Sequence, residues 1–300
     1  MIQSAPERTS LPEDDTRRAS LVAHVRNALH SLPAYYTSGT NIEGLEASDL
    51  FNLNTMLSSS IEIQVVDSLN NLRTVWDPDG DWPEYTFIRS ASTFPDVRLV
   101  ARIDEQISTA LGIELKGWYL LSKESAPSYR YKITPSACSP YDLLVVVPWH
   151  LKNVLSGMPV VREPYIEQAK YVAEYRNYWW QYIRQARGDP TIIQPENVTP
   201  LGRQPRDQVN DEPRSDSGGN FGRIARIGVM DQYLETMMLS RVAGIEARHW
   251  ITFFRLYADA ADTEAITTKM GALLATHTST DDEAAAEAAE LLTRLTELLH

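Results

Sequence analysis

Apolar residues recur every three or four positions between residues 45 and 76. This spacing places them on one face of a helix, so it predicts one long amphipathic helix or two stacked ones. A shorter helix is expected before it, over residues 21–32, and the turn-forming run DPDGDWPE at residues 77–84 ends the helical pattern. The apolar positions are Leu50, Leu53, Leu57, Ile61, Val65, Leu69 and Leu72.

Strand-like segments follow at residues 85–90, 96–102, 112–121, 128–133 and 142–149. The last of them, DLLVVVPW, is a continuous aliphatic run, which is typical of a strand covered on both faces. Thr134 and Pro135 have the residue types of a helix start, so a short helix is expected between two of the strands. The pattern predicts an α/β fold with a central mixed β-sheet of four to five strands flanked by helices.

The chain beyond Pro164 is mostly helical by its pattern. A stretch rich in Gly, Pro and Asp, residues 188–222, interrupts it. We therefore divide the chain into an N-terminal extension with a short helix (1–44), an α/β core (45–160) and a helical region (161–300) that ends in acidic helices. Helices are expected at residues 166–187, 230–257, 264–275 and 281–299.

The net charge of −12 (28 − 40) argues at first against a nucleic-acid partner. The excess is uneven, because residues 259–300 hold nine acids and two bases, a net −7, which leaves −5 for the rest of the chain. Residues 170–226 hold nine bases against seven acids, and nearly all of these bases are Arg, which suits phosphates and guanine edges. Charge therefore predicts a local basic cleft and does not exclude DNA.

The single cysteine, Cys138, excludes an intramolecular disulfide and a Cys-rich metal site, which is the usage expected in a reducing cytoplasm. The N-terminal run MIQSAPERTSLPEDD is polar, and the longest apolar runs are too short to span a bilayer. We therefore predict a cytoplasmic protein with no membrane partner. The histidines lack the i, i+4 spacing of a zinc site, and no P-loop, Rossmann or G-x-S-x-G string occurs.

The strand-like segment GIELKGWYLL carries a carboxylate and an ammonium two residues apart. Because side chains alternate along a strand, Glu114 and Lys116 share one face about 6 to 7 Å apart, which favours two groups reaching toward one bound object over a tight ion pair. Asp96 opens another strand-like segment upstream. If the two strands are neighbours, Asp96 and Glu114 converge, and a hard cation such as Mg²⁺ would relieve their repulsion.

Pro95-Asp96, seventeen intervening residues and then Glu114-Leu115-Lys116 resemble the motif of the PD-(D/E)XK nuclease superfamily, which includes many type II restriction endonucleases. The resemblance covers roughly residues 45–150. It implies a restriction-endonuclease-like core in which Asp96 and Glu114 hold Mg²⁺, or Mn²⁺ as a substitute, while Lys116 orients or activates the attacking water. The backbone carbonyl of Leu115 would be a further ligand.

Two other acids are alternatives at the same centre. In several members of the superfamily an acid on the leading helix approaches the metal, and by that resemblance Glu62 is a candidate ligand. The segment RIDEQISTALG between the two halves of the motif has a helical pattern. If it is a helix, the two catalytic strands do not pair directly, and Asp104 could replace Asp96 as the metal acid.

Candidate DNA contacts lie in the basic middle region. A Gly-rich loop, SDSGGNFGRIARIG at residues 215–228, can approach a phosphate backbone closely, or it is an ordinary surface loop before the next helix. The preceding helix carries Tyr171, Tyr175, Tyr178 and Tyr182 at helical spacing, which fits core packing as well as base stacking. The residues expected to contact DNA are Arg176, Arg184, Asn220, Arg223 and Arg226.

Three functions are compatible with these patterns. By the resemblance, the first is a Mg²⁺-dependent DNA endonuclease of the site-specific restriction or phage-defence type, which cuts double-stranded DNA as a homodimer because two strands need two symmetric sites. The second is a catalytically inactive DNA-binding or assembly component of a defence system that keeps the nuclease fold. The third is an interaction scaffold whose acidic helical tail, residues 259–300, binds a partner.

Overall fold

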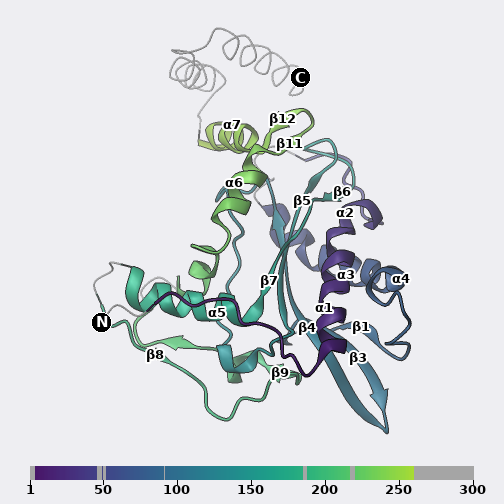
Figure 1. The fold of residues 1–300 in the computed structure, drawn as a ribbon. Helices are drawn as coiled ribbons and strands as arrows, with labels where there is room; N and C mark the ends of the chain where they lie inside the picture. Colours follow the sequence, from purple (N-terminus) through teal and green to yellow (C-terminus); the bar gives the residue numbers. More distant parts are fainter. Residues whose placement is uncertain are drawn as a thin grey trace.

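The computed structural model describes residues 4–45, 49, 52–90, 92–184, 188–216 and 220–259 (Figure 1). Asp15 caps the first helix, because its side-chain oxygen accepts a hydrogen bond from the backbone N–H of Arg18 at 3.0 Å, and the helix therefore begins earlier than predicted. The helical pattern over residues 45–76 corresponds to one long helix, which begins at Leu53, and a single four-residue turn after it. The N-terminal helices are α1 (Thr16–His30), α2 (Leu32–Tyr35), α3 (Leu53–Asn71) and α4 (Arg73–Trp76).

A mixed sheet of six strands forms the centre of the fold, in the order β1-β3-β4-β5-β6, with β7 also pairing with β5. β3 and β4 run antiparallel, whereas β4 and β5 run parallel. The predicted α/β class with a mixed sheet flanked by helices is confirmed, and the sheet also takes in β7, which lies in the segment assigned to the C-terminal region. The strands are β1 (Thr86–Arg89), β3 (Val97–Ile103), β4 (Gln106–Tyr119), β5 (Leu143–Leu151), β6 (Pro159–Val161) and β7 (Tyr165–Gln168).

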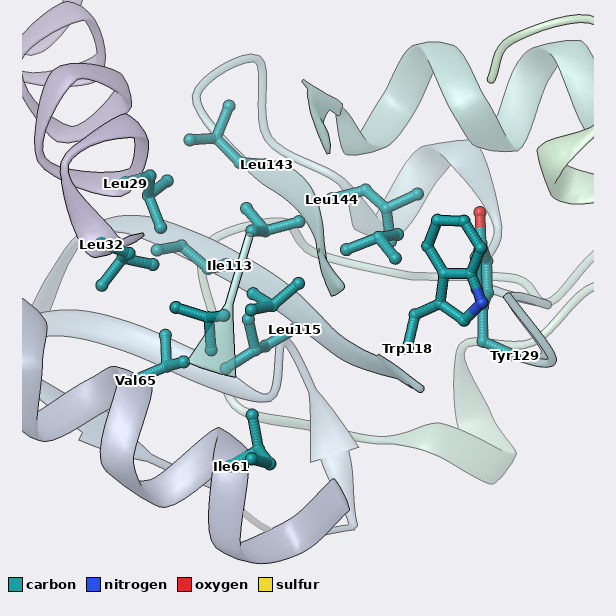
Figure 2. Close-up of a cluster of buried hydrophobic side chains, with 14 of the residues drawn as sticks. Leu29, Leu32, Ile61, Val65, Ile113, Leu115, Trp118, Tyr129, Leu143 and Leu144 are labelled. Atoms are coloured by element: carbon teal, nitrogen blue, oxygen red, sulfur yellow. The ribbon is translucent and has the colours of Figure 1, made fainter. Parts of the chain in front are cut away.

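The two faces of the sheet pack against different elements. Figure 2 shows Ile113 and Leu115 of β4 on the side of Ile61 and Val65 from α3, while Trp118 lies apart from them, beside Tyr129. On the other face, α5 (Ala169–Tyr178) packs against β5 and β7. β5 is buried along its whole length, as its aliphatic run predicts.

The expectation of a strand at residues 128–133 is wrong. Only Ile133 of this segment makes a bridge, an isolated one to Asn210. Tyr131 is buried, and its hydroxyl donates a hydrogen bond to the Ala169 carbonyl at 2.9 Å. The alternating apolar pattern of this segment therefore comes from packing under α5 and not from sheet pairing. The short helix expected after it is present as a single 3-10 turn, Pro135–Ala137.

The described part of the C-terminal region combines helices with small two-stranded sheets. A π-helical turn, Trp179–Ile183, continues α5, and α6 (Asp231–Leu239) and α7 (Ala247–Asp259) follow. The helices expected at residues 264–275 and 281–299 lie outside the described residues. No helix in the described ranges is both long and apolar enough to cross a membrane. The small sheets pair β2 (Thr93–Phe94) with β9 (Gln204–Pro205), β8 (Ile192–Ile193) with β10 (Glu212–Pro213), and β11 (Arg241–Val242) with β12 (Ile245–Glu246).

Candidate active site

Asp96 meets Glu114 because β3 and β4 form an antiparallel hairpin. Val97 pairs with Ile113, so Asp96, one residue before β3, lies opposite Glu114 on the same face of the sheet. The helix expected at residues 102–112 is therefore wrong. Its β-branched residues extend β4 instead, since such side chains fit a pleated surface well.

Asp104 lies at the tip of this hairpin, far from the two convergent carboxylates. Asp104 and Glu105 have φ angles of 47° and 63°, in the left-handed region that tight two-residue hairpin turns require. Seven residue pairs of the β3–β4 ladder separate this turn from Glu114, a length of about 20 Å at the rise of a strand. Asp104 is also exposed, so this position rules it out as a metal acid beside Glu114.

Lys116 joins both carboxylates. Its ammonium nitrogen lies 2.9 Å from Asp96 Oδ2 and 2.7 Å from Glu114 Oε1. The expectation that Glu114 and Lys116 stay too far apart to pair is wrong, because the flexible Lys side chain bridges the spacing between alternate residues on one strand face. The three residues of the motif therefore form one cluster, in which Glu114 is fully buried while the side chains of Asp96 and Lys116 are each 16% exposed.

Arg206 completes the cluster and was not singled out from the sequence. Its two terminal nitrogens donate to the Glu114 carboxylate at 2.8 and 3.0 Å, and one of them also donates to Asp96. Arg206 directly follows β9, whose pairing with β2 fixes it beside the segment that leads into Asp96. In the sequence, Arg206 is only one of the nine basic residues between positions 170 and 226. Its neighbouring residues form no motif that would distinguish it from the other eight.

The four charges set one another's protonation. Burial alone would raise the pKa of Asp96, but Lys116 and Arg206 outweigh it and hold that pKa below its ordinary value. Burial and then the negative charge of Asp96 raise the pKa of Glu114. For Lys116, the two carboxylates outweigh burial and raise the pKa. Lys116 is therefore charged at neutral pH and acts as a hydrogen-bond donor, and Glu114 takes up a proton before Asp96 as the pH falls.

The carboxylate pair has the chemistry of a site for a hard divalent cation. Asp96 and Glu114 present only oxygen ligands, and one Arg206 nitrogen contacts both carboxylates, so the two residues would hold a cation in place of that nitrogen. Within the described ranges, no group of three or more His, Cys, Asp and Glu side chains forms such a cluster. Two carboxylates with several waters match the coordination that Mg²⁺ keeps in proteins. Cation binding at this point requires Arg206 to release the pair.

Glu62 lies on α3, but its carboxylate pairs outside this cluster. Its carboxylate pairs with Arg89 of β1 at 2.9 Å, and the same Arg89 nitrogen lies 3.3 Å from the Ser59 hydroxyl. Arg89 pairs in the sheet with Val97, so the ion pair with Arg89 holds Glu62 near the start of β3. Its role as a further metal ligand stays a prediction, as does that of the Leu115 carbonyl.

Asp142 fixes the position of β4 next to the cluster. Its carboxylate accepts hydrogen bonds from the backbone N–H groups of Gly112 and Ser139, both at 2.7 Å. Burial raises the pKa of Asp142 to about 6, and these hydrogen bonds act against the rise. A Cβ on Gly112 would lie 2.3 Å from Pro95 Cγ and 2.8 Å from the Asp142 carboxylate. The strand thus needs glycine two residues before Glu114 so that Pro95 can approach it.

Arg176 is buried inside the fold and does not reach the surface. It is fully buried and pairs with Asp211, also fully buried, at 2.7 Å. It also donates to the backbone carbonyls of Tyr131 and Ile133 at 2.7 and 3.0 Å, and its guanidinium lies over the Phe221 ring. Every one of these contacts joins α5 to neighbouring loops. The interpretation of Arg176 as a DNA contact is therefore corrected to a structural role.

The other four predicted DNA contacts lie outside the core. Arg184 places its guanidinium 3.1 Å from the centre of the Trp180 ring, and Arg226 donates to the Pro127 carbonyl at 3.0 Å. Asn220 and Arg223 are exposed. Within the described part of the chain, none of these four residues bonds to the Asp96 and Glu114 cluster, so their role on DNA stays a prediction.

Comparison with known proteins adds no relative to this picture. No protein-family model, curated protein or solved structure matches the chain.

Proposed function

We propose that this chain is a Mg²⁺-dependent DNA endonuclease that hydrolyses phosphodiester bonds, of the site-specific restriction or phage-defence type. The observation that carries the proposal is the convergence of Asp96, Glu114 and Lys116 from adjacent strands, with Lys116 within 2.9 Å of both carboxylates. The resemblance to PD-(D/E)XK nucleases requires these three side chains to meet, and in the described structure they form ion pairs with one another and with Arg206.

The carboxylates and the lysine have different tasks in this proposal. Asp96 and Glu114 would hold the cation, and Lys116, kept protonated by its two acidic neighbours, would orient the attacking water and donate a hydrogen bond to a phosphate oxygen. When bound, Mg²⁺ supplies Lewis-acid stabilisation of the charge that develops on the phosphoryl group and on the leaving 3′-oxygen. Water attacks phosphorus, the bond to the 3′-oxygen breaks, and the water proton passes to solvent.

The test uses purified protein with plasmid DNA in Mg²⁺, in Mn²⁺ and in EDTA. We expect discrete fragments with either metal and none in EDTA. Asp96→Asn and Lys116→Met should each lower the cleavage rate about 10²- to 10³-fold or more, the usual effect of removing a group that stabilises transition-state charge. Asp104→Asn is the matched control, because it removes a carboxylate from the same hairpin, and it should cut like the wild type. Uncut DNA in both metals, or wild-type rates from Asp96→Asn, contradicts the proposal.

Assembly is part of the same proposal. Cleavage of both strands by one type of site needs two copies related by symmetry, so we propose a homodimer on double-stranded DNA. Sedimentation velocity with and without a duplex would measure the mass. A monomer that only nicks DNA would contradict the dimer while leaving the chemistry of the centre intact.

One observation favours a second function. Arg206 and Lys116 together pair with both carboxylates, so the cluster is electrically balanced without a metal. A chain that keeps this arrangement permanently would be a DNA-binding or assembly component that retains the nuclease fold but not its chemistry. Calorimetric titration with Mg²⁺, Mn²⁺ and Ca²⁺ separates the two functions, because heat of binding that Asp96→Asn abolishes supports the nuclease, whereas duplex binding without any cation binding supports the second function.

A further inference from the structure

Arg98 is a buried cation that has no carboxylate partner among the described residues. The residue is 5% exposed, and its one hydrogen bond runs from Nη1 to the neutral hydroxyl of Thr109 at 3.3 Å. Its Nε is buried and has no partner. A buried charge without a counter-charge costs free energy, and a bound anion would relieve that cost.

Arg98 faces the same side of the sheet as the candidate active site. It lies two residues after Asp96 in the extended chain and pairs with Gly112, which lies two residues before Glu114. Because strand side chains alternate, Asp96, Arg98 and Glu114 share one face. Arg98 is therefore the neighbour of the carboxylate pair along the sheet.

A second arginine approaches Arg98 from the chain that carries Arg206. In the small sheet of β2 and β9, Phe94 pairs with Gln204, so Arg203 lies opposite Pro95, beside the segment that leads to Asp96 and Arg98. Arg203 is exposed, so it can meet a ligand from solvent, and it directly precedes β9. Gln204, the next residue, has a buried side-chain amide nitrogen that also has no partner.

The group has a surplus of positive charge in an acidic protein. Lys116, Arg206, Arg98 and Arg203 oppose Asp96, Glu114 and the neighbouring Asp142, a balance of 4 − 3 = +1 in a chain of net charge −12. A surplus of this kind, before any divalent cation is added, attracts an anion. The fork of a guanidinium suits the oxygens of a phosphate.

We infer that Arg98 and Arg203 form a phosphate-binding position beside the carboxylate pair, which takes a backbone phosphodiester of the DNA next to the one being cut. The inference rests on the proposed function for the identity of its ligand. It assigns Arg98 and Arg203 a positioning role, since they hold the duplex in register while Asp96, Glu114 and Lys116 face the scissile phosphate. Inorganic phosphate has the same chemistry and serves as the small probe.

The first experiment measures thermal unfolding in phosphate and in chloride at equal ionic strength. Phosphate should raise the melting temperature of the wild type more than chloride does, and Arg98→Met should lose that difference. Arg98→Met should also melt higher than the wild type in chloride, because it removes an unpaired buried charge. Arg102→Met, which removes an exposed arginine from the same strand, should behave like the wild type. An equal phosphate response in Arg98→Met, or a lower melting temperature of that variant in chloride, overturns the inference.

The second experiment measures the binding of a short fluorescein-labelled duplex in Ca²⁺ by anisotropy at several salt concentrations. Arg98→Met and the exposed-site variant Arg203→Gln should each weaken binding about tenfold on every sequence and flatten the slope of log K against log salt by about one. Unchanged affinity and slope in both variants overturn the inference. If the wild type binds no duplex, the nuclease proposal fails, and a phosphate response that depends on Arg98 still supports the anion position.

Discussion

Two arginine–carboxylate systems in this protein are built in opposite ways. Arg176 and Asp211 are both fully buried, and Arg176 is further held by the carbonyls of Tyr131 and Ile133. Arg206 also pairs with carboxylates, but its side chain is 28% exposed and it shares its partners with Lys116. In the first system neutral groups surround one ion pair, whereas in the second two cations compete for two anions.

The difference separates a charge that stabilises the fold from charges that can change partners. Arg176 bonds to the backbone of one loop at Tyr131 and Ile133 and to the side chain of Asp211 on another, so losing it would disturb both loops. The Arg206 side chain bonds only to carboxylates, so it can leave them without breaking a bond to the backbone. Lys116 would still pair with both carboxylates, and solvent reaches the cluster. The fully buried pair therefore serves the fold here, and the partly exposed cluster that Asp96 shares with Glu114 and Lys116 of β4 is the place for chemistry.

The largest expected effect is on the buried pair. Arg176→Met should lower the free energy of unfolding by about 3–5 kcal/mol, because it leaves Asp211 as a buried charge without its cation. Urea unfolding followed by circular dichroism measures it. Lys116→Met is the comparison within the cluster, and it should cost much less, since Arg206 still bonds both carboxylates.

Removing the charge of Asp211 as well provides the control. The double variant Arg176→Met with Asp211→Asn should recover part of the loss, because no unpaired charge then remains in the core. A greater cost for Lys116→Met than for Arg176→Met would reverse the comparison and make the cluster the structural element.

His150 extends the comparison to a buried group that titrates. It lies on β5, and Arg162 Nε donates to its Nε2 at 3.0 Å while its Nδ1 lies 2.8 Å from the Leu151 carbonyl. Burial, with a smaller contribution from Arg162, lowers the pKa of His150 from 6.5 to about 4, against the effect of the Leu151 bond. The ring is thus neutral in the folded protein, with Nδ1–H donating to Leu151.

The sign of the pH effect follows from that neutral ring. Between pH 6.5 and about 4 the unfolded chain binds a proton on His150 that the folded chain does not, so acidification lowers stability. The free energy of unfolding of the wild type, minus that of His150→Gln, should therefore decrease by about 3 kcal/mol when the pH is lowered from 7 to 4. Asp142 has the opposite effect over this pH range, because its raised pKa stabilises the folded state on acidification. Both proteins contain Asp142, so its contribution drops out of the subtraction. A pH-independent difference would show that His150 is not held neutral.

Gly112 tests where the fold and the site meet. Gly112→Ala places a methyl group against Pro95 and Asp142 and should cost about 1–3 kcal/mol through overpacking, with loss of cleavage as Asp96 moves. Gly117→Ala on the same strand meets its nearest atom, Ser58 Oγ, at 3.4 Å and should cost little. Urea unfolding and the plasmid assay measure both variants. Equal effects of the two substitutions would show that the position of Pro95 does not require a glycine at residue 112.

The parts of the site that sequence could predict are local in the chain. Asp96 and Glu114 lie on strands that follow each other directly, so strand periodicity and one hairpin bring them together. Arg206 lies 92 residues beyond Glu114 in the chain and is placed by a pairing of only two residues per strand, too short to leave a hydrophobic pattern. For that reason the position of Arg206 beside Asp96 and Glu114 could not be predicted from the sequence.

The wrong predictions have a related cause. Arg176 reads as a surface base on a helix, but its burial depends on Asp211, 35 residues further on. Residues 128–133 alternate like a strand because they pack under α5, and periodicity does not distinguish packing from pairing. Arg98 looks like an ordinary polar position of a half-buried strand, and only the lack of a carboxylate around it marks it as unusual.

The smallest expected effect decides whether the cluster can change partners. Arg206→Met should bind Mn²⁺ and Ca²⁺ about fivefold more tightly than the wild type by calorimetry, because a partly exposed pair is worth about 1 kcal/mol and the cation no longer has to displace it. Arg214→Met, which breaks an exposed pair with Asp189, should leave the affinity unchanged. Equal or weaker cation binding by Arg206→Met would mean that Arg206 supports the carboxylates as Arg176 supports Asp211, and the contrast between the two systems would disappear.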